Sequence, residues 1–152
     1  MKIVFKWTDG NNEDFQNFYL KTEEYYSSIV GGIKNREDFV PYNLSKNITR
    51  VLIAYVDGVP AGCAGLKTYS ETEIEIKRLW VDPEYRGNHI AEKLMDRIEK
   101  RAKYFGYGKA ILQTRPQMEA AVSLYLKRGY VLINNYPPYD KLEGAICFSK
   151  TL

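Results

Sequence analysis

The chain has 152 residues, of which 45% are hydrophobic, and it carries a formal net charge of +3. Length and composition fit a single domain over residues 1–152, because a second core would need more apolar surface than the chain contains. The mild positive charge suits a polyanionic ligand, but basic and acidic residues are too interspersed for a nucleic-acid-binding surface. Cys63, Cys147 and the single histidine, His89, have neither metal-ligand spacing nor the density of a disulfide framework, so no metal is expected.

The chain begins with an alternating segment and an aromatic one. Residues 2–7 predict a strand, and Asn11-Asn12 offers a cap for the helix that follows. That helix carries aromatic side chains that are mostly expected in the core: Phe15, Phe18, Tyr19, Tyr25 and Tyr26. Residues 31–47, with their glycines, charges and Pro41, predict a loop or a broken helix.

Neither a targeting segment nor a membrane span is predicted. Lys2, Lys6 and Asp9 interrupt the start of the chain, so it lacks the apolar centre of a signal peptide. The longest apolar run, residues 51–56, is too short to cross a bilayer. These features favour a cytoplasmic protein without membrane association.

The middle of the chain predicts an antiparallel meander followed by a helix. Residues 50–55 and 60–68 flank Asp57-Gly58, a strong hairpin signal, and a third strand follows over residues 72–81. Beyond Pro83, apolar residues recur at helical spacing until Gly106 ends the helix: Ile90, Leu94, Met95, Ile98, Ala102 and Phe105.

The last third alternates strand and helix. Residues 109–114 predict a strand, a helix then runs as far as Gly129, and residues 130–133 and 145–149 predict two closing strands. This order of elements predicts an α/β (α+β) sandwich around one mixed sheet.

The third strand of the meander changes the face of its apolar residues. Ile74 and Ile76 share one parity whereas Leu79 and Val81 share the other, so strict alternation breaks between Ile76 and Leu79. A β-bulge at the break would restore the alternation, bend the strand and leave backbone groups without ladder partners. The alternative is that Leu79 packs on the second face of a buried strand.

A glycine-bearing turn connects this strand to the next helix. A helix N-terminus has unpaired N–H groups and partial positive charge, so a pyrophosphate can lie against it. Gly87 would allow close backbone approach and Arg86 would add charge. An ordinary connecting turn is the alternative at this position.

Residues 81–91 resemble the GNAT superfamily of acyl-CoA-dependent N-acetyltransferases. The signature of that superfamily is Arg/Gln-x-x-Gly-x-Gly/Ala after a Val-x-Pro strand end; Arg86 and Ala91 fit it, and His89 replaces its first glycine. Residues 120–130 are similar to the family's Ala-x-x-x-Tyr-x-x-x-Gly-aromatic helix end, whereas Met118 stands where many members have asparagine. The resemblance covers nearly the whole chain.

The resemblance implies a GNAT-like three-layer sandwich with helices on both faces of a central, splayed sheet. It also implies acetyl-CoA as cosubstrate, with its pantetheine arm against the backbone of the splayed strand at Leu79, Trp80 and Val81. The pyrophosphate would then bind the loop made of Arg86, Gly87, Asn88, His89, Ile90 and Ala91, with the His89 side chain turned outward.

Thioester aminolysis requires a neutral amine, a stabilised oxyanion and a proton for the thiolate. By resemblance Tyr125 is the general acid, although a core tyrosine is the structural alternative. Glu75, and less so Glu73, could accept the ammonium proton, although both could instead lie on a solvated strand face. Arg128 could pair with the 3'-phosphate of CoA or merely complement a helix dipole.

The expected function is therefore transfer of an acetyl group from acetyl-CoA to a primary amine of a small molecule or peptide. The alternative is a non-catalytic acyl-CoA-binding or sensing module, which would lack an open acceptor cleft. The acceptor would be bound by variable loops near residues 39–47 and 134–139, and its identity cannot be read from the sequence. A homodimer is possible, and no nucleic acid or membrane partner is expected.

Overall fold

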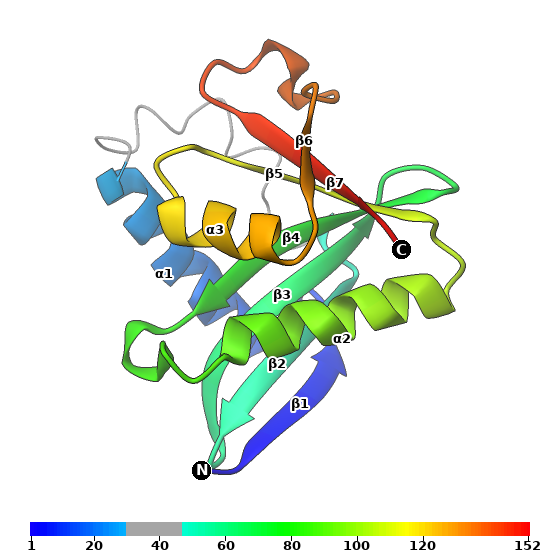
Figure 1. Ribbon diagram of the computed structural model, residues 1–152. Helices are drawn as coiled ribbons and strands as arrows, with labels where there is room; N and C mark the ends of the chain where they lie inside the picture. Colours follow the sequence, from blue (N-terminus) through cyan, green and yellow to red (C-terminus); the bar gives the residue numbers. More distant parts are fainter. Residues whose placement is uncertain (30–46) are drawn as a thin grey trace.

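The computed structural model describes residues 1–29 and 47–152, and its frame is a seven-stranded sheet in the order β1-β2-β3-β4-β5-β7-β6 (Figure 1). The predicted loop over residues 31–47 lies outside the described residues except for Asn47. The strands are β1 (Ile3–Thr8), β2 (Arg50–Val56), β3 (Val59–Thr68), β4 (Glu73–Val81), β5 (Lys109–Thr114), β6 (Val131–Ile133) and β7 (Ile146–Thr151).

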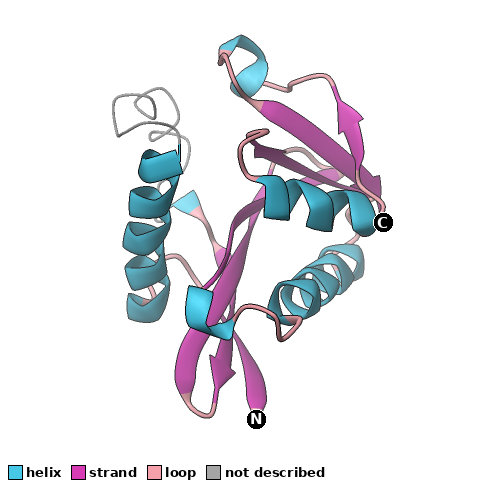
Figure 2. Cartoon of the chain, turned by 60° about the vertical axis from the view of Figure 1, so that its left-hand side comes forward, coloured by secondary structure: helices cyan, strands magenta, loops and turns pink. Residues whose placement is uncertain are grey.

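Helices cover both faces of this sheet (Figure 2). α1 (Glu13–Ile29) lies on one face, and α2 (Ile90–Tyr104) and α3 (Glu119–Lys127) lie on the other. Two short 3-10 turns, η4 (Pro83–Tyr85) and η5 (Tyr139–Lys141), follow β4 and precede β7. The α/β sandwich predicted from the order of elements, and the three-layer arrangement implied by the resemblance, are therefore confirmed.

Each face of the sheet has its own apolar core. The larger core packs α2 and α3 on the sheet and includes Leu94, Ile98 and Phe148. The smaller one packs α1 on the other face through Phe15 and Phe18, which are buried as expected. None of the helices in the described ranges is both long and apolar enough to cross a membrane.

The meander and its hairpin form as predicted. β2 pairs with β3 and β3 with β4, all antiparallel. Asp57 and Gly58 both have positive φ, 48° and 83°, which is the geometry of a type I′ turn that matches the twist of the flanking strands.

β4 contains the predicted bulge. Cys63 pairs with Trp80 and Gly65 with Lys77, so one residue of β3 opposes two residues of β4. Arg78 adopts φ 61° at this point. After the bulge Leu79 and Val81 pack in the same core as Ile76, so the alternative in which Leu79 packs on the second face is wrong.

β4 and β5 form a fork. They are the parallel pair of the sheet, and their pairing covers only Glu73 to Glu75 against Lys109 to Ile111. Beyond that point β4 stays with β3 and β5 stays with β7, so the two strands diverge (Figure 1). The predicted splayed, mixed sheet is thus confirmed.

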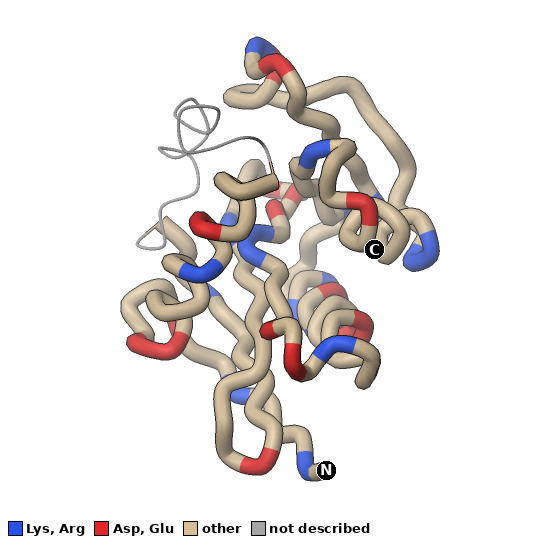
Figure 3. The backbone as a smooth tube through the Cα atoms, turned by 90° about the vertical axis from the view of Figure 1, so that its left-hand side faces the viewer, with Lys and Arg blue, Asp and Glu red and all other residues tan. Residues whose placement is uncertain are grey.

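Charged residues are spread over all layers of the fold. Along the backbone, Lys and Arg are interspersed with Asp and Glu instead of gathering on a single element (Figure 3). The net positive charge is therefore not concentrated in one stripe of the described chain.

Close contact between β3 and β4 holds the strand end in place, and it can be tested at Gly62. A Cβ at Gly62 would lie 2.6 Å from the Trp80 carbonyl oxygen. Gly62→Ala should therefore lower the free energy of unfolding by about 1 to 3 kcal/mol in urea titrations. Gly108→Ala is the matched control, because its nearest atom would lie 4.0 Å away. Equal losses in the two variants would contradict this packing argument.

Candidate active site

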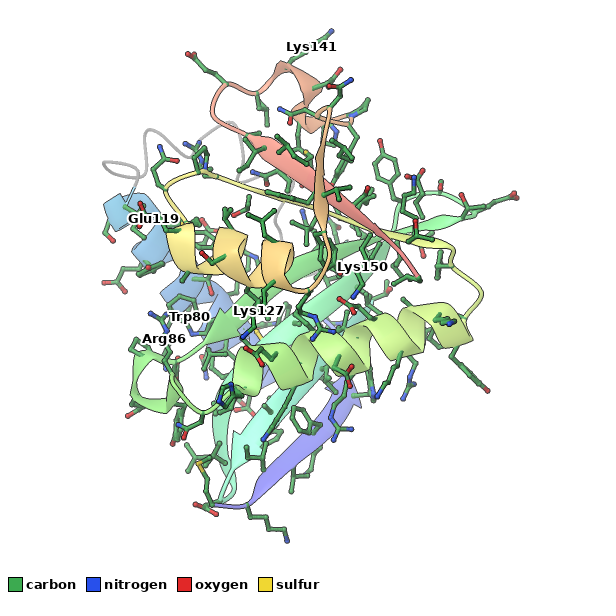
Figure 4. The ribbon with its side chains drawn as sticks, viewed as in Figure 1. Trp80, Arg86, Glu119, Lys127, Lys141 and Lys150 are labelled. Carbon is green, nitrogen blue, oxygen red and sulfur yellow. The ribbon has the colours of Figure 1, made fainter. Side chains whose placement is uncertain are left out.

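A groove of about 390 Å³ lies at the open end of the fork. Its walls come from the end of α1, the end of β4, the loop to α2, and the start of α3. Trp80 lies near the end of β4, Arg86 in the loop between β4 and α2, and Glu119 at the start of α3 (Figure 4). The lining residues central to the site are Tyr25, Tyr26, Leu79, Trp80, Val81, Arg86, Gly87, His89, Ile90, Ala91 and Met118.

The loop before α2 is shaped by two residues with positive φ. Gly87 has φ 86° and His89 has φ 59°. Histidine tolerates this left-handed conformation better than branched residues do, which explains how His89 can occupy the position of a signature glycine. Its side chain is 71% exposed, in agreement with the outward orientation expected from the sequence.

The N-terminus of α2 carries no side-chain cap. His89 is the capping residue, but its side chain makes no capping hydrogen bond. The first N–H groups of a helix lack intrahelical acceptors and bear partial positive charge. Because His89, Ile90 and Ala91 line the groove, this helix end can receive an anionic ligand.

Backbone groups of β4 face the open side of the fork. The Asp82 N–H donates to the Ala61 carbonyl of β3 at 2.8 Å. Alternate residues of a strand direct their N–H and C=O to opposite neighbours, so those of Leu79 and Val81 point away from β3. β5 has left that side of the strand, so these groups have no strand partner there.

Arg86 spans the end of this strand. Its Nε donates to the Val81 carbonyl at 3.0 Å, and its guanidinium lies 5.1 Å from the Trp80 ring. Asn88 is fixed nearby, because its amide donates to the Tyr85 carbonyl at 3.0 Å. The loop is therefore held in shape by its own side chains before any ligand binds.

A smaller cavity of about 60 Å³ lies deeper in the fork. It shares Tyr26, Leu79, Met118 and Ala121 with the groove, so the two spaces adjoin each other. Its remaining lining residues are Ile76, Lys77, Arg78, Gln113, Thr114, Arg115 and Tyr125. It thus lies between the strand end that carries the bulge and the helix that carries Tyr125.

Tyr125 combines access to this cavity with burial. Its ring packs against Tyr130 and Phe148, with centroids 5.8 and 6.3 Å away. Burial, and secondarily the nearby Tyr26, raises the pKa of the Tyr125 hydroxyl well above its usual range. The hydroxyl therefore stays protonated at neutral pH and can act as a donor.

Glu75 is buried and lies outside both lining sets. Its carboxylate accepts a hydrogen bond from the Tyr136 hydroxyl at 2.7 Å, and Lys77 Nζ lies 3.8 Å away. The alternative in which Glu75 belongs to a solvated strand face is therefore wrong. Glu73 is half-buried, and its carboxylate accepts a hydrogen bond from the Ser70 hydroxyl at 3.2 Å.

Comparison with known proteins decides the family. The sequence profile of the Acetyltransferase (GNAT) family matches residues 4–130. The chain belongs to this family. It is accordingly an acetyl-CoA-dependent acyltransferase.

Individual relatives agree with this assignment. An IAA acetyltransferase of Azospirillum brasilense is 32% identical over 110 residues, which span 72% of each chain. Among solved structures, the PaiA N-acetyltransferase of Thermoplasma acidophilum in complex with coenzyme A is similar, with a TM-score of 0.76 and 20% identity over the full length of both chains. A GNAT family acetyltransferase of Elizabethkingia anophelis with acetyl-CoA bound has a TM-score of 0.72 at 18% identity, over 99% of this chain and 98% of that one.

Arg128 of this GNAT protein is not among the residues that line the groove or the inner cavity, although its Nη1 donates to the carbonyl of Glu92, a groove residue, at 3.4 Å. Its guanidinium forms two hydrogen bonds to Glu99, of 2.8 and 3.3 Å. Glu99 also accepts hydrogen bonds from Lys150 and Tyr130, each at 2.8 Å. A largely buried carboxylate thus engages the side chain that was expected to bind a phosphate.

Three cationic residues of the inner cavity were not assigned to the site from the sequence: Lys77, Arg78 and Arg115. All are less than 10% exposed. Lys77 and Arg78 stand at the break in alternation, and Arg115 directly follows β5. A sequence signal did exist, because ligands of open α/β sheets bind where neighbouring strands end or part.

The assignment of Arg128 can be tested through stability and binding together. Burial raises the pKa of Glu99, but hydrogen bonds from Arg128, Lys150 and Tyr130 outweigh burial and hold that pKa below its usual value. Arg128→Gln should lower the free energy of unfolding by about 1.5 kcal/mol at neutral pH. A carboxylate with a depressed pKa stabilises the fold above its unfolded pKa, so the deficit should shrink as acid protonates Glu99.

The measurements are urea unfolding at neutral and acidic pH, and calorimetric titration with CoA. We expect an unchanged dissociation constant for CoA in Arg128→Gln. A large loss of CoA affinity with unchanged stability would return Arg128 to the cofactor site.

Proposed function

We propose that this GNAT protein transfers an acetyl group from acetyl-CoA to a primary amine of a small molecule or peptide. Both substrates are bound together, and the amine attacks the thioester directly. The observation that carries this proposal is that the groove and the inner cavity adjoin and share four wall residues, so that an anion-receiving helix end lies near the bulged strand and Tyr125. The cytoplasmic location and the homodimer stay predictions from the sequence.

The groove is assigned to the cosubstrate. Arg86 and the uncapped N-terminus of α2 supply positive charge for the pyrophosphate, and Gly87 leaves open space beside the backbone. The backbone groups of Leu79 and the N–H of Val81, which have no strand partner on the open side, are suited to the amide-containing pantetheine arm, which would pair with them as a strand does. The two similar structures with coenzyme A and acetyl-CoA bound support this choice of ligand.

The reaction is assigned to the point where groove and cavity meet. The amine nitrogen forms a bond to the thioester carbonyl carbon, and backbone N–H groups at the bulge donate to the resulting oxyanion. As the carbon–sulfur bond breaks, the Tyr125 hydroxyl donates its proton to the departing sulfur. The proton that the nitrogen loses after attack returns to the Tyr125 oxygen and regenerates the acid, and an acceptor that is bound as an ammonium must lose one further proton before it can attack.

Glu75 is proposed to receive that amine proton. Because its carboxylate lies behind the cavity wall, the proton would reach it through water or through the Tyr136 hydroxyl, which is bound to it at 2.7 Å. An amine that is already neutral would need no such help.

A non-catalytic acyl-CoA-binding module would also use the groove, but it would have no need for a cavity beside the thioester. Membership of the acetyltransferase family and the presence of this cavity both favour the enzyme. Mass spectrometry of amine mixtures incubated with the protein and acetyl-CoA separates the two functions, because only an enzyme yields acetylated product.

Removing Arg86 tests the cosubstrate site. Arg86→Ala should weaken CoA binding by about 1.5 to 3 kcal/mol, the range for a hydrogen bond to a charged group. Isothermal titration calorimetry measures this loss directly. Lys100→Ala is the control, because it removes the same charge from a site that is 77% exposed and outside the groove. Wild-type affinity in Arg86→Ala would remove Arg86 from the site.

Removing the Tyr125 hydroxyl tests the acid. Tyr125→Phe should lower kcat by roughly 100-fold or more, the usual contribution of a general acid, and leave CoA affinity intact. Tyr104→Phe is the control, because that tyrosine is 83% exposed on α2. Stopped-flow or steady-state detection of free CoA provides the rates. Wild-type turnover by Tyr125→Phe on the best acceptor would end the assignment.

A further inference from the structure

The outer edge of β1 is bordered by arginines that stack on aromatic rings. β1 is the first strand in the sheet order, so its outer side has no partner among the described strands (Figure 1). The guanidinium of Arg97 on α2 lies 4.1 Å from the centroid of the Phe5 ring, and that of Arg101 lies 4.4 Å from the Trp7 ring. None of these four residues lines the groove or the inner cavity.

The row continues at the end of α2. The Phe105 ring centroid lies 4.2 Å from the guanidinium of Arg50 and 5.9 Å from that of Arg101. Phe105 is 39% exposed and its neighbour Tyr104 is 83% exposed, so large rings remain open to solvent here. We call the following set the edge patch: Phe5, Trp7, Arg50, Arg97, Arg101 and Phe105.

The arginines of the edge patch are not neutralised by carboxylates. Within the described ranges, no Asp or Glu forms an ion pair with Arg50, Arg97 or Arg101. The acidic residues of α2 instead form their ion pairs with His89, Lys100, Lys127, Arg128 and Lys150. A ring covers only one flat face of a guanidinium, so the N–H groups in its plane remain available as donors.

The outward backbone groups of β1 belong to the same residues as the stacked rings. The Lys2 carbonyl accepts a hydrogen bond of 2.8 Å from the N–H of Asp57, which directly follows β2. Because successive residues of a strand direct their backbone groups to opposite sides, Phe5 and Trp7 direct theirs away from β2. An extended peptide can therefore pair with Phe5 and Trp7, as in recognition by strand addition.

The spacing of the arginines matches the spacing of alternate residues in a strand. From Arg97 to Arg101 an α-helix rises about 6 Å, and from Phe5 to Trp7 a strand advances about 6.6 Å. Residues of an added strand that lie opposite Phe5 and Trp7 would place their side chains on the same face as those rings. Side chains at alternate positions of the added strand would thus each meet one arginine.

We propose that the edge patch binds an extended acidic segment of a partner protein, which pairs with β1 and carries carboxylates at alternate positions. Main-chain hydrogen bonds to Phe5 and Trp7 supply affinity, and carboxylates that accept two parallel hydrogen bonds from each guanidinium supply specificity. This interaction is independent of the acetyl transfer proposed above.

A second copy of this chain fits the edge less well than an acidic partner does. Pairing of two β1 strands would bring Arg97 and Arg101 of one copy toward the same residues of the other. Charged side chains beside an edge strand oppose this kind of self-pairing. The same cations attract a strand of opposite charge.

Fluorescence anisotropy with synthetic peptides tests the class of partner. The probe is a labelled peptide in which glutamate alternates with threonine, and its affinity for the full chain is measured at low salt. One comparison peptide carries lysine in place of glutamate, a second groups all its glutamates together, and a third is methylated at the amide nitrogens that would face β1. We expect the probe to bind about fivefold more tightly than each of the three, as two exposed charge pairs or lost main-chain hydrogen bonds predict.

Variants locate the contact on the protein. Arg97→Gln and Arg101→Gln should each lower the affinity for the probe by about two- to fivefold, the range for exposed charge pairs. Lys103→Gln is the matched control, because Lys103 is exposed on α2 and lies about 200° around the helix from Arg101. It should bind the probe with wild-type affinity. Circular dichroism shows whether each variant is folded.

Hydrogen exchange tests the register on the wild-type chain and needs no variant. The bound probe should slow exchange of the Phe5 and Trp7 N–H groups. Those of Val4 and Lys6 already face β2, so their exchange should stay the same.

Several results would overturn the proposal and leave the acetyl transfer untouched. The first is failure of the probe to bind, or equal binding of the probe and the grouped peptide. The second is wild-type affinity in both Arg97→Gln and Arg101→Gln. The third is a dimer that protects the Phe5 and Trp7 N–H groups without peptide, which would assign the edge to a second copy. The fourth is arginine-dependent binding of oligothymidylate or phosphatidylserine vesicles in preference to the probe, which would assign it to nucleic acid or membrane.

Discussion

The site depends on the parting of β4 from β5 after three paired residues. Up to Glu75 and Ile111 the two strands satisfy each other's backbone groups, and beyond that point each keeps only its outer neighbour. A free strand edge inside a domain would normally leave polar backbone groups unsatisfied, which is costly. Here the edge opens into the groove, where solvent or an amide-containing ligand can satisfy them. The groove therefore exists because the hydrogen-bond ladder between β4 and β5 stops after Glu75 and Ile111.

The bulge at Arg78 allows β4 to leave its neighbour without losing its core. By adding one residue it returns Leu79 and Val81 to the core that already holds Ile74 and Ile76. Without it, every later side chain would change face. The bulge also turns the strand end toward α2, whose N-terminus completes the groove. One local irregularity therefore links packing on one side of the strand to ligand access on the other.

Two groups of buried charged residues lie in different parts of the fold, one away from the inner cavity and one in its wall. Glu99 of α2 accepts hydrogen bonds from Arg128, Tyr130 and Lys150, which all lie beyond α3 in the chain. Lys77 and Arg78 are also paired, but from behind, and they remain part of a cavity wall. Buried charges are expensive unless they are paired, and these ion pairs allow Lys77 and Arg78 to lie in the wall of a largely enclosed cavity.

The sequence by itself determined the order of elements, the hairpin at Asp57-Gly58, the break in alternation along β4 and the turn before α2, because each depends on residues close together in the chain. Parity along β4 located the bulge, and the helix-end pattern around Tyr125 pointed to the family. Only the tertiary structure decided that Glu75 is buried under Tyr136, that Arg128 is engaged by Glu99, and that Lys77, Arg78 and Arg115 share one cavity. These outcomes depend on contacts between segments 29 to 61 residues apart, and the alternation or spacing of residues within one segment carries no information on which distant side chain will meet it.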